Sequence, residues 1–442
     1  MHTICIDFGT SSIRAAVRKE RNVLPHPLAI ASKSVIDNAS IPSAIFISKA
    51  GDEVLFGVKA LESGLSGKPS LLFETSPKAW LSPKNIGELD SPAVAGLAFS
   101  RRQLVTGLLS LSVRAARRAA EKAFELAPDT LAYRVSHPVW EKSQRSRMNR
   151  EYDALRRIAC ASVGGQVKYV MTGEEFAHWC AKAVPDSGLP AADVEVEEPV
   201  AATLELFPDP PLNRRSAALV VDVGAGTIDL GLFASVMPDK GSKVKHKLIP
   251  MASPRSLFGA GDEIDRTLIK LVIHKLGRGN DAQLARLKND IRSFKERLFD
   301  NGNLVYDQIE VSVDELIATP ELKAMAAGLR RAMDDMFSEA GARFKTELTA
   351  PVHRLDHLDV VFAGGGAKLG FLRALVGNLE SMDGNKLTVR QVEAERPPNF
   401  EVEASLARMA VALGGTTPDR DWPKTEMDVA VIHALSAPLP AK

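Results

Sequence analysis

Residues 218–233 read Ala-Leu-Val-Val-Asp-Val-Gly-Ala-Gly-Thr-Ile-Asp-Leu-Gly-Leu-Phe, and this stretch decides the fold. The apolar run up to Val223 is rich in β-branched residues, which predicts a strand. After Gly224, Ala225 and Gly226, apolar residues alternate with polar or small ones, which predicts a second strand. The stretch is therefore interpreted as a strand, a glycine turn and a second strand.

This turn carries groups that suit a phosphate and a cation. Glycines let backbone N–H groups approach an anion closely, and Thr227 adds a hydroxyl. Asp222 and Asp229 add carboxylates, which predicts a metal ion, most simply Mg²⁺. The rival interpretation is a dinucleotide-binding G-x-G-x-x-G turn, but Asp229 occupies its third glycine position and no helix is predicted next.

Residues 3–17 repeat the same pattern near the start of the chain. A strand carries Asp7 close to its end, and alternation resumes from Ile13. The predicted turn holds small and hydroxyl residues: Gly9, Thr10, Ser11 and Ser12. Two such units, each with an aspartate before a glycine and a hydroxyl after it, predict two lobes that grip the phosphates of one nucleotide in a central cleft.

Composition sets limits on the class of protein. A chain of 442 residues exceeds one ordinary core, which favours two lobes. The formal net charge of +1, without a long run of one sign, predicts neither a nucleic-acid nor a membrane partner. Cys5, Cys160 and Cys180 lack metal-ligand spacing, and the chain shows neither a leader nor an apolar run of membrane length. We expect a cytoplasmic protein.

Four further stretches carry candidate groups. The predicted strand 358–363 leads into Gly364, Gly365 and Gly366 and then a helical pattern, which suits close approach of a purine-ribose to backbone. Glu198 stands before a proline at a predicted helix start, where it either points into a cleft or only stabilises the helix end. From composition alone, Lys78 is interpreted as a surface lysine. His137 has no partner group in sequence and is interpreted as structural.

Five motifs occur in a telling order: Ile-Asp-Phe-Gly-Thr at 6–10, Glu-Pro-Val-Ala-Ala at 198–202, Asp-Val-Gly-Ala-Gly-Thr at 222–227, Gly-Asp-Glu-Ile-Asp at 261–265 and Gly-Gly-Gly at 364–366. Together they resemble the sugar-kinase, heat-shock and actin ATPase superfamily, and most closely the nucleotide-binding domain of DnaK-type 70-kDa heat-shock chaperones. The resemblance covers roughly residues 1–415. It implies an α/β, two-lobed actin-like ATPase fold of duplicated ribonuclease-H-like domains.

The resemblance also implies roles for individual residues. Asp7 and Asp222 match the pair that holds Mg²⁺ through water, and Glu198 matches the acid that orients the attacking water. Lys78 falls where the family has its phosphate-facing lysine, so the resemblance replaces the surface interpretation. The matched phosphate and nucleoside contacts are Gly9, Thr10, Ser11, Ser12, Gly224, Ala225, Gly226, Thr227, Lys295, Gly364, Gly365, Gly366 and Lys368.

The chain departs from the family pattern at several positions. Ala225 replaces the middle glycine, and Lys368 replaces an arginine of the adenosine motif. Arg292 and Glu296 stand where the family tends to have an acid and an arginine. The first expected lobe is residues 1–205, with a small subdomain at about 39–107. The second is residues 216–400, with a helical subdomain at about 259–345. A helix at 401–415 is expected to return to the first lobe, and 416–442 to form a short tail.

These observations lead to one expected function and two alternatives. We expect Mg²⁺-dependent binding and slow hydrolysis of ATP to ADP and phosphate, with lobe closure coupled to an unknown protein partner. About 27 residues after 415 are too few for a peptide-binding domain, so no binding of unfolded polypeptide is expected. The alternatives are a nucleotide-sensing scaffold with little or no hydrolysis and a small-molecule kinase of the same superfamily.

Overall fold

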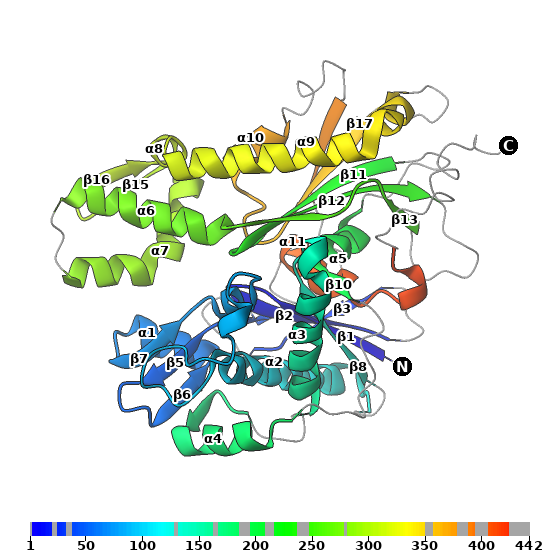
Figure 1. The fold of residues 1–442 in the computed structure, drawn as a ribbon. Coiled ribbons are helices and arrows are strands. Elements are labelled where there is room, and N and C mark those ends of the chain that lie inside the picture. Colours follow the sequence, from blue (N-terminus) through cyan, green and yellow to red (C-terminus); the bar gives the residue numbers. More distant parts are fainter. Residues whose placement is uncertain are drawn as a thin grey trace. The chain divides into compact units, whose positions relative to one another are not determined.

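The computed structural model describes residues 2–19, 24–31, 38–127, 131–161, 167–184, 195–207, 216–236, 247–277, 281–349, 357–377, 388–393 and 405–423. They divide into two compact units (Figure 1). Unit 1 contains the described residues up to 206 together with 405–422. Unit 2 contains those from 207 to 393 together with Pro423.

Unit 1 is built on a mixed sheet with the strand order β10-β8-β1-β2-β3, and β4 also pairs with β2. The strands are β1 (His2–Phe8), β2 (Ser12–Arg18), β3 (His26–Pro27), β4 (Ser40–Pro42), β8 (Leu131–His137) and β10 (Val196–Glu197). β1 is antiparallel to β2 and parallel to β8, and β10 is parallel to β8. The predicted hairpin at residues 3–17 is therefore confirmed.

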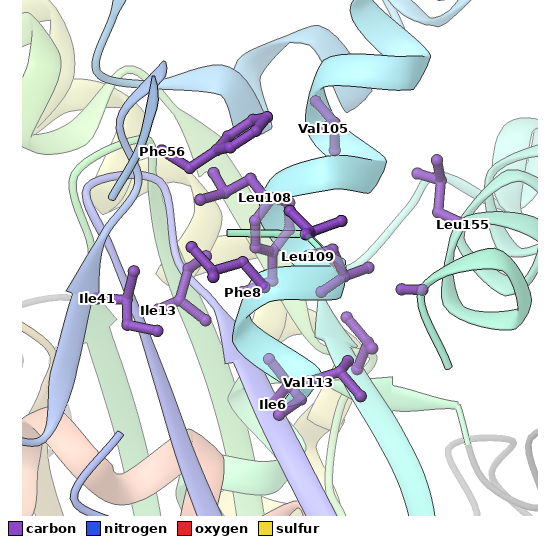
Figure 2. Packing of buried hydrophobic residues seen from close by; sticks show 14 of the residues in the cluster. Ile6, Phe8, Ile13, Ile41, Phe56, Val105, Leu108, Leu109, Val113 and Leu155 are labelled. Carbon is purple, nitrogen blue, oxygen red and sulfur yellow. The ribbon is translucent and has the colours of Figure 1, made fainter. Parts of the chain in front are cut away.

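Helices cover both faces of β1, which is why its sequence is apolar at successive positions. The larger helices of unit 1 are α2 (Arg101–Phe124), α3 (Lys142–Ala161), α5 (Glu198–Leu206) and α11 (Leu406–Gly414). Figure 2 shows Ile6 of β1 beside Val113 of α2, and Phe8 of β1 beside Leu109. Cys5 points to the opposite face, where its sulfur lies beside Gly415 at the end of α11.

A second, four-stranded sheet in unit 1 has the order β7-β5-β6-β9. Its strands are β5 (Ile45–Ser48), β6 (Glu53–Phe56), β7 (Ser70–Glu74) and β9 (Val170–Thr172), and α1 (Val58–Leu65), α4 (Gly173–Lys182) and the 3₁₀ turns η1 (Pro77–Leu81) and η2 (Ile86–Glu88) accompany it. Phe176 of α4 joins this sheet to the main core through rings 5.5 Å from Phe56 and 4.8 Å from Phe99. The sheet places η1, and with it Lys78, at a fixed position in the unit.

The turn after α11 is held to unit 1 by buried arginines. Arg134 of β8 donates to the carbonyl oxygens of Gly415 at 3.1 Å and Thr417 at 2.5 Å. Arg18 of β2 donates to Thr416 Oγ1 at 3.2 Å. Arg134 is 2% exposed, so the two carbonyls depend on it rather than on water.

Arg134→Met should lower the free energy of unfolding of unit 1 by about 2–3 kcal/mol, because it leaves buried carbonyls without their charged donor. All four tryptophans, at positions 80, 140, 179 and 422, lie in unit 1. Urea unfolding followed by tryptophan fluorescence therefore reports on this unit. The matched control, Arg118→Met on the exposed side of α2, should leave the midpoint unchanged, and an equal loss in both variants would contradict the expectation.

Unit 2 is built on a mixed sheet with the order β13-β12-β11-β17-β18, and β14 also pairs with β12. The strands are β11 (Ser216–Val223), β12 (Thr227–Val236), β13 (Lys247–Pro250), β14 (Arg255–Phe258), β17 (His357–Ala363) and β18 (Thr388–Val392). β11 is antiparallel to β12 and parallel to β17, which is parallel to β18. A strand, not a helix, follows the glycine turn, so the dinucleotide interpretation fails and the hairpin is confirmed.

A mostly helical part completes unit 2. Its elements are α6 (Ala260–Leu276), α7 (Asp281–Asn301), β15 (Asn303–Tyr306), β16 (Ile309–Ser312), α8 (Val313–Ile317), α9 (Pro320–Thr349) and α10 (Gly370–Gly377). Leu268 of α6, Phe294 and Leu298 of α7, and Leu322 of α9 share one core. Leu287, Phe294 and Leu298, which recur at helical spacing along α7, are buried.

The two main sheets have the same strand order and the same pattern of parallel and antiparallel pairs. The chain is therefore an α/β protein with two ribonuclease-H-like units, as the sequence predicted. Such a duplication is consistent with an actin-like ATPase architecture. Among the described residues no helix is both long and apolar enough to cross a membrane. The predicted tail, 416–442, lies mostly outside the described residues.

Candidate functional site

In unit 1, four polar side chains meet where β1 and β8 end. Lys78 of η1 donates to Glu198 Oε1 at the start of α5. The hydroxyl of Ser136 lies 3.2 Å from Glu198 Oε1 and 3.2 Å from Asp7 Oδ1. All four residues are at least nine-tenths buried. The structure thus brings together Asp7, Lys78 and Glu198, which are up to 191 positions apart in sequence.

The charges of this cluster shift one another's protonation. Burial and then the neighbouring Glu198 raise the pKa of Asp7 from 3.8 to about 6, against the opposing effect of Arg14 and Lys78. Burial lowers the pKa of Lys78, but the charges of Glu198, Tyr152 and Asp7 and the hydrogen bond to Glu198 together outweigh burial, so the pKa lies above its ordinary value. Asp7 is thus costly to ionise, and a bound cation would stabilise its ionised form.

The turn between β1 and β2 is fixed by its neighbours. A Cβ on Gly9 would overlap the carbonyl oxygen of Ser12, so only glycine fits there. Ser43 donates its hydroxyl to the carbonyl oxygen of Gly9 at 2.7 Å and its N–H to that of Ser11 at 3.1 Å. Thr10 and Ser11 are half-exposed, whereas Ser12 is buried as the first residue of β2. The first two hydroxyls are therefore the ones accessible to a ligand.

In unit 2, three glycine turns converge on Asp222. A Cβ on Gly364, whose φ is 79°, would overlap the Asp222 carboxylate and the carbonyl oxygen of Val223. A Cβ on Gly261 would lie 3.1 Å from Ala225 Cα and 3.2 Å from the carbonyl oxygen of Gly224. The turns at 224–226, 259–261 and 364–366 therefore pack backbone against backbone.

These turns are also joined by hydrogen bonds. Gly259 and Gly261 donate their N–H groups to the carbonyl oxygens of Gly226 at 2.8 Å and Gly224 at 3.2 Å. Gly366 donates to the carbonyl oxygen of Val223 at 2.9 Å. Close backbone packing of this kind leaves the predicted contacts Gly224, Ala225, Gly226, Gly364, Gly365 and Gly366 partly exposed around one aspartate.

A buried acid supports the hydroxyl of the phosphate turn. Thr227 donates to Asp229 Oδ2 at 2.6 Å, and Ser256 of β14 donates to Asp229 Oδ1. Asp229 is 1% exposed, so it is a support for Thr227 rather than an accessible ligand. The sequence alone singles out the carboxylate of Asp229 but not this role, because Ser256 is 27 residues away.

The predicted nucleoside contacts lie beside these turns. Lys295 of α7 forms an ion pair with Asp265 of α6 at 2.7 Å and donates to the carbonyl oxygen of Gly261 at 3.3 Å. Arg292 and Glu296, on the same face of α7, pair with each other at 3.6 Å. Lys368 is exposed, and its charge helps to lower the pKa of Glu393. Lys295 is thus tied to the site, whereas Lys368 stands at its solvent side.

Three supporting residues could not be singled out from sequence: Ser43, Ser136 and Ser256. Each is a serine in a strand or turn whose partner is distant in the chain. The only available signal for Ser136 is its place at the end of a strand that runs parallel to the Asp7 strand, where polar side chains collect.

Asp7 and Asp222 are the two carboxylates that the resemblance assigns to hydrated Mg²⁺. Among the described residues no group of three or more histidine, cysteine, aspartate or glutamate side chains could hold a metal ion. Mg²⁺ keeps several of its waters in proteins and needs only one or two carboxylates. Asp7 in unit 1 has a raised pKa, and Asp222 in unit 2 lies beside the Gly364 turn; each is a carboxylate of the kind that contacts such an ion through water.

Comparison with known protein families and with curated proteins finds no match for this chain. The fold and the geometry of the two sets of residues therefore carry the functional argument.

Proposed function

We propose that the chain is a Mg²⁺-dependent ATP-binding protein of the actin-like superfamily, similar to the nucleotide-binding domain of DnaK-type chaperones, that hydrolyses ATP slowly. One observation supports this best. Asp7 is the second-to-last residue of β1 and Asp222 the second-to-last residue of β11, and each precedes a glycine turn and an antiparallel strand. A duplicated acid and turn suits two sets of metal and phosphate contacts.

In this proposal unit 1 supplies the chemistry. Glu198 orients a water for in-line attack on the γ-phosphorus, the bond to the bridging oxygen breaks, and the proton of the water passes to the Glu198 carboxylate. Lys78 neutralises charge on the transferred phosphoryl group, which requires it to exchange part of its contact with Glu198 for the phosphate. Ser136 holds Glu198 in place.

Unit 2 supplies most of the grip on the nucleotide. The backbone N–H groups of the 224–227 turn bind phosphate, and the Lys295 and Asp265 pair is placed to bind ribose hydroxyls. The Gly364–Gly366 turn offers its backbone to the adenosine. Mg²⁺, held through water by Asp7 and Asp222, would neutralise the phosphates.

Mg-ATP and Mg-ADP should both raise the melting temperature. A ligand that binds only the folded state stabilises it by about 2.7 kcal/mol at 100 times its Kd. That corresponds to a shift of roughly 5 °C or more for a unit of this size. Differential scanning calorimetry with and without EDTA measures it. An unmoved melting temperature at saturating Mg-ATP and Mg-ADP would overturn the proposed function.

A matched pair of variants ties this shift to the site. Asp222→Asn should lose most of the Mg²⁺-dependent part of the shift. Asp314→Asn, an exposed acid in α8 of the same unit, should keep all of it. Equal shifts in both variants would place the metal elsewhere.

Arg292 and Glu296 of α7, whose charges are reversed relative to the family pattern, favour a second candidate, a nucleotide-sensing scaffold with little or no hydrolysis. Arg292 and Glu296 neutralise each other at 3.6 Å instead of presenting the family's acid and arginine to the nucleoside. Single-turnover hydrolysis of labelled ATP, with and without candidate sugars, distinguishes the ATPase, the scaffold and a small-molecule kinase.

A further inference from the structure

The two residues at the end of β8 face opposite ways. Ser136 contacts Asp7 and Glu198, as described above. His137 faces the other side of the sheet and pairs in register with Glu197 of β10. Residues in register on parallel strands point to the same face, so His137 and Glu197 are side by side. The functional pair, Ser136 with Glu198, and the buried pair, His137 with Glu197, are therefore adjacent along both strands.

Aromatic rings enclose His137 on its own face. The imidazole stacks on Trp140 with ring centroids 5.9 Å apart and an interplanar angle of 14°, and it meets the edge of Tyr152 at 5.6 Å. Trp140 and Tyr152 contact each other at 5.5 Å. His137 and Trp140 are each 4% exposed, so bulk water does not reach them.

Among the described residues, His137 Nε2, Trp140 Nε1 and Glu197 Oε2 have no hydrogen-bond partner, and neither has Nε of Arg145. His137 Nδ1 lies 2.8 Å from the carbonyl oxygen of Pro138, which can only accept, so Nδ1 carries the proton and Nε2 a lone pair. Burial lowers the pKa of His137, which keeps the imidazole neutral. Arg145 pairs with the other oxygen of Glu197 at 3.4 Å.

One indole donor and two acceptors match the hydrogen-bonding capacity of one water. A buried water typically makes about three hydrogen bonds to groups that otherwise lack partners. Trp140 would donate to it, and it would donate to Nε2 and Oε2. The two acceptors, His137 Nε2 and Glu197 Oε2, would repel an anion, and the indole N–H would repel a cation, so neither ion fits as well as water.

We propose that His137, Trp140 and Glu197 bind one buried water, and that this water makes His137 a positioning residue for Glu198. The water joins the ends of β8 and β10 to the loop before α3. Ser136 directly precedes His137 on β8, and Glu198, the first residue of α5, directly follows Glu197. Glu198 and Lys78 both act electrostatically on His137, which places the two sites close together. The positioning half of this inference rests on the proposed function; the water site does not.

The test uses ring-conserving variants of the full chain. His137→Phe keeps a ring in the stack but removes both nitrogens, and Trp140→Phe removes the indole donor together with one of the two fused rings. Each should lower kcat for ATP about 10-fold with KM unchanged, since a misplaced catalytic group slows the chemical step. His137→Gln, which restores an acceptor near Nε2, should recover most of kcat. Trp179→Phe, whose indole stacks on Phe176 elsewhere in unit 1, should change nothing.

Two readouts do not depend on nucleotide. A high-resolution crystal structure should show a water within hydrogen-bonding distance of Nε2, Nε1 and Oε2. The double variant His137→Phe/Trp140→Phe should lose no more melting temperature than the worse single variant, because both remove the same water.

The outcomes separate the two parts of the inference. Absence of the water, or additive losses of melting temperature, overturns the water site. An unchanged kcat in His137→Phe, or no recovery in His137→Gln, overturns the positioning role. Wild-type protein that neither binds nor hydrolyses ATP overturns the proposed function and the positioning role, while the crystal structure and the melting temperatures still decide the water site.

Discussion

Glu198→Gln should slow ATP hydrolysis by about 100-fold or more while leaving nucleotide affinity unchanged. The glutamine keeps the shape of the side chain and can still accept from Ser136, which lies 3.2 Å from Oε1. It cannot take the proton of the attacking water. Single-turnover hydrolysis measures the rate, and isothermal titration with Mg-ATP measures the affinity. Loss of binding instead would mean that Glu198 is structural.

A double-variant cycle sharpens this expectation. Lys78→Met should also lower the rate, because it removes the cation that faces the phosphoryl group. When two residues act as a unit, the effects of their substitutions on the rate do not multiply. The double variant Glu198→Gln/Lys78→Met should therefore be at most a few-fold slower than the slower single variant. Independent, multiplying effects would contradict the ion pair as a catalytic unit. Lys59→Met, an exposed lysine paired with Glu62 in α1, is the matched control and should retain full activity.

The ion pair also marks where sequence reasoning from composition fails. Lys78 follows Pro77 and precedes Ala79 and Trp80, and nothing local distinguishes it from a surface lysine. Its burial follows from Glu198, which is 120 residues away. Only the resemblance to a family pointed to it, and the structure agrees that it is buried and paired.

The hairpins, by contrast, were predictable because their signal is local. An apolar run before the glycine turn and alternation after it specify two strands, and Asp222↔Asp229 and Val223↔Ile228 are indeed partners. Arg134 shows the limit of such patterns. The strand that contains it is evident from sequence, but its burial depends on the carbonyls of residues 415 and 417, which no local pattern connects to β8.

Asp7 is a buried acid whose ionisation makes the folded protein less stable. Its pKa is raised to about 6 in the folded protein. The free energy of unfolding therefore falls as pH rises from about 4 through 6, because Asp7 loses a proton that the folded state binds more tightly, and this contribution to stability is lost at neutral pH. A buried acid of this kind is expected where a cation binds and is hard to anticipate from sequence. The neighbouring carboxylate that raises the pKa, Glu198, is 191 residues away.

Gly364→Ala should be among the most destabilising single changes in unit 2. The residue adopts a φ of 79°, which costs an alanine about 1–3 kcal/mol, and the new methyl group would overlap the Asp222 carboxylate and the Val223 carbonyl oxygen. Relief of that overlap moves the 364–366 turn or Asp222, at a further cost of about 1–3 kcal/mol. We expect a total loss of about 4 kcal/mol in the free energy of unfolding.

Gly365→Ala is the matched control, because a Cβ at Gly365 meets nothing within 4 Å and its φ lies outside the left-handed region. Its free energy of unfolding should stay within about 0.5 kcal/mol of wild type. Urea unfolding followed by far-UV circular dichroism reports on both units, whereas tryptophan fluorescence reports on unit 1 alone. The Gly364→Ala loss should therefore appear in the circular dichroism transition. Equal stability of the two alanine variants would mean that the turn yields without cost, and that Asp222 is not held in place by Gly364.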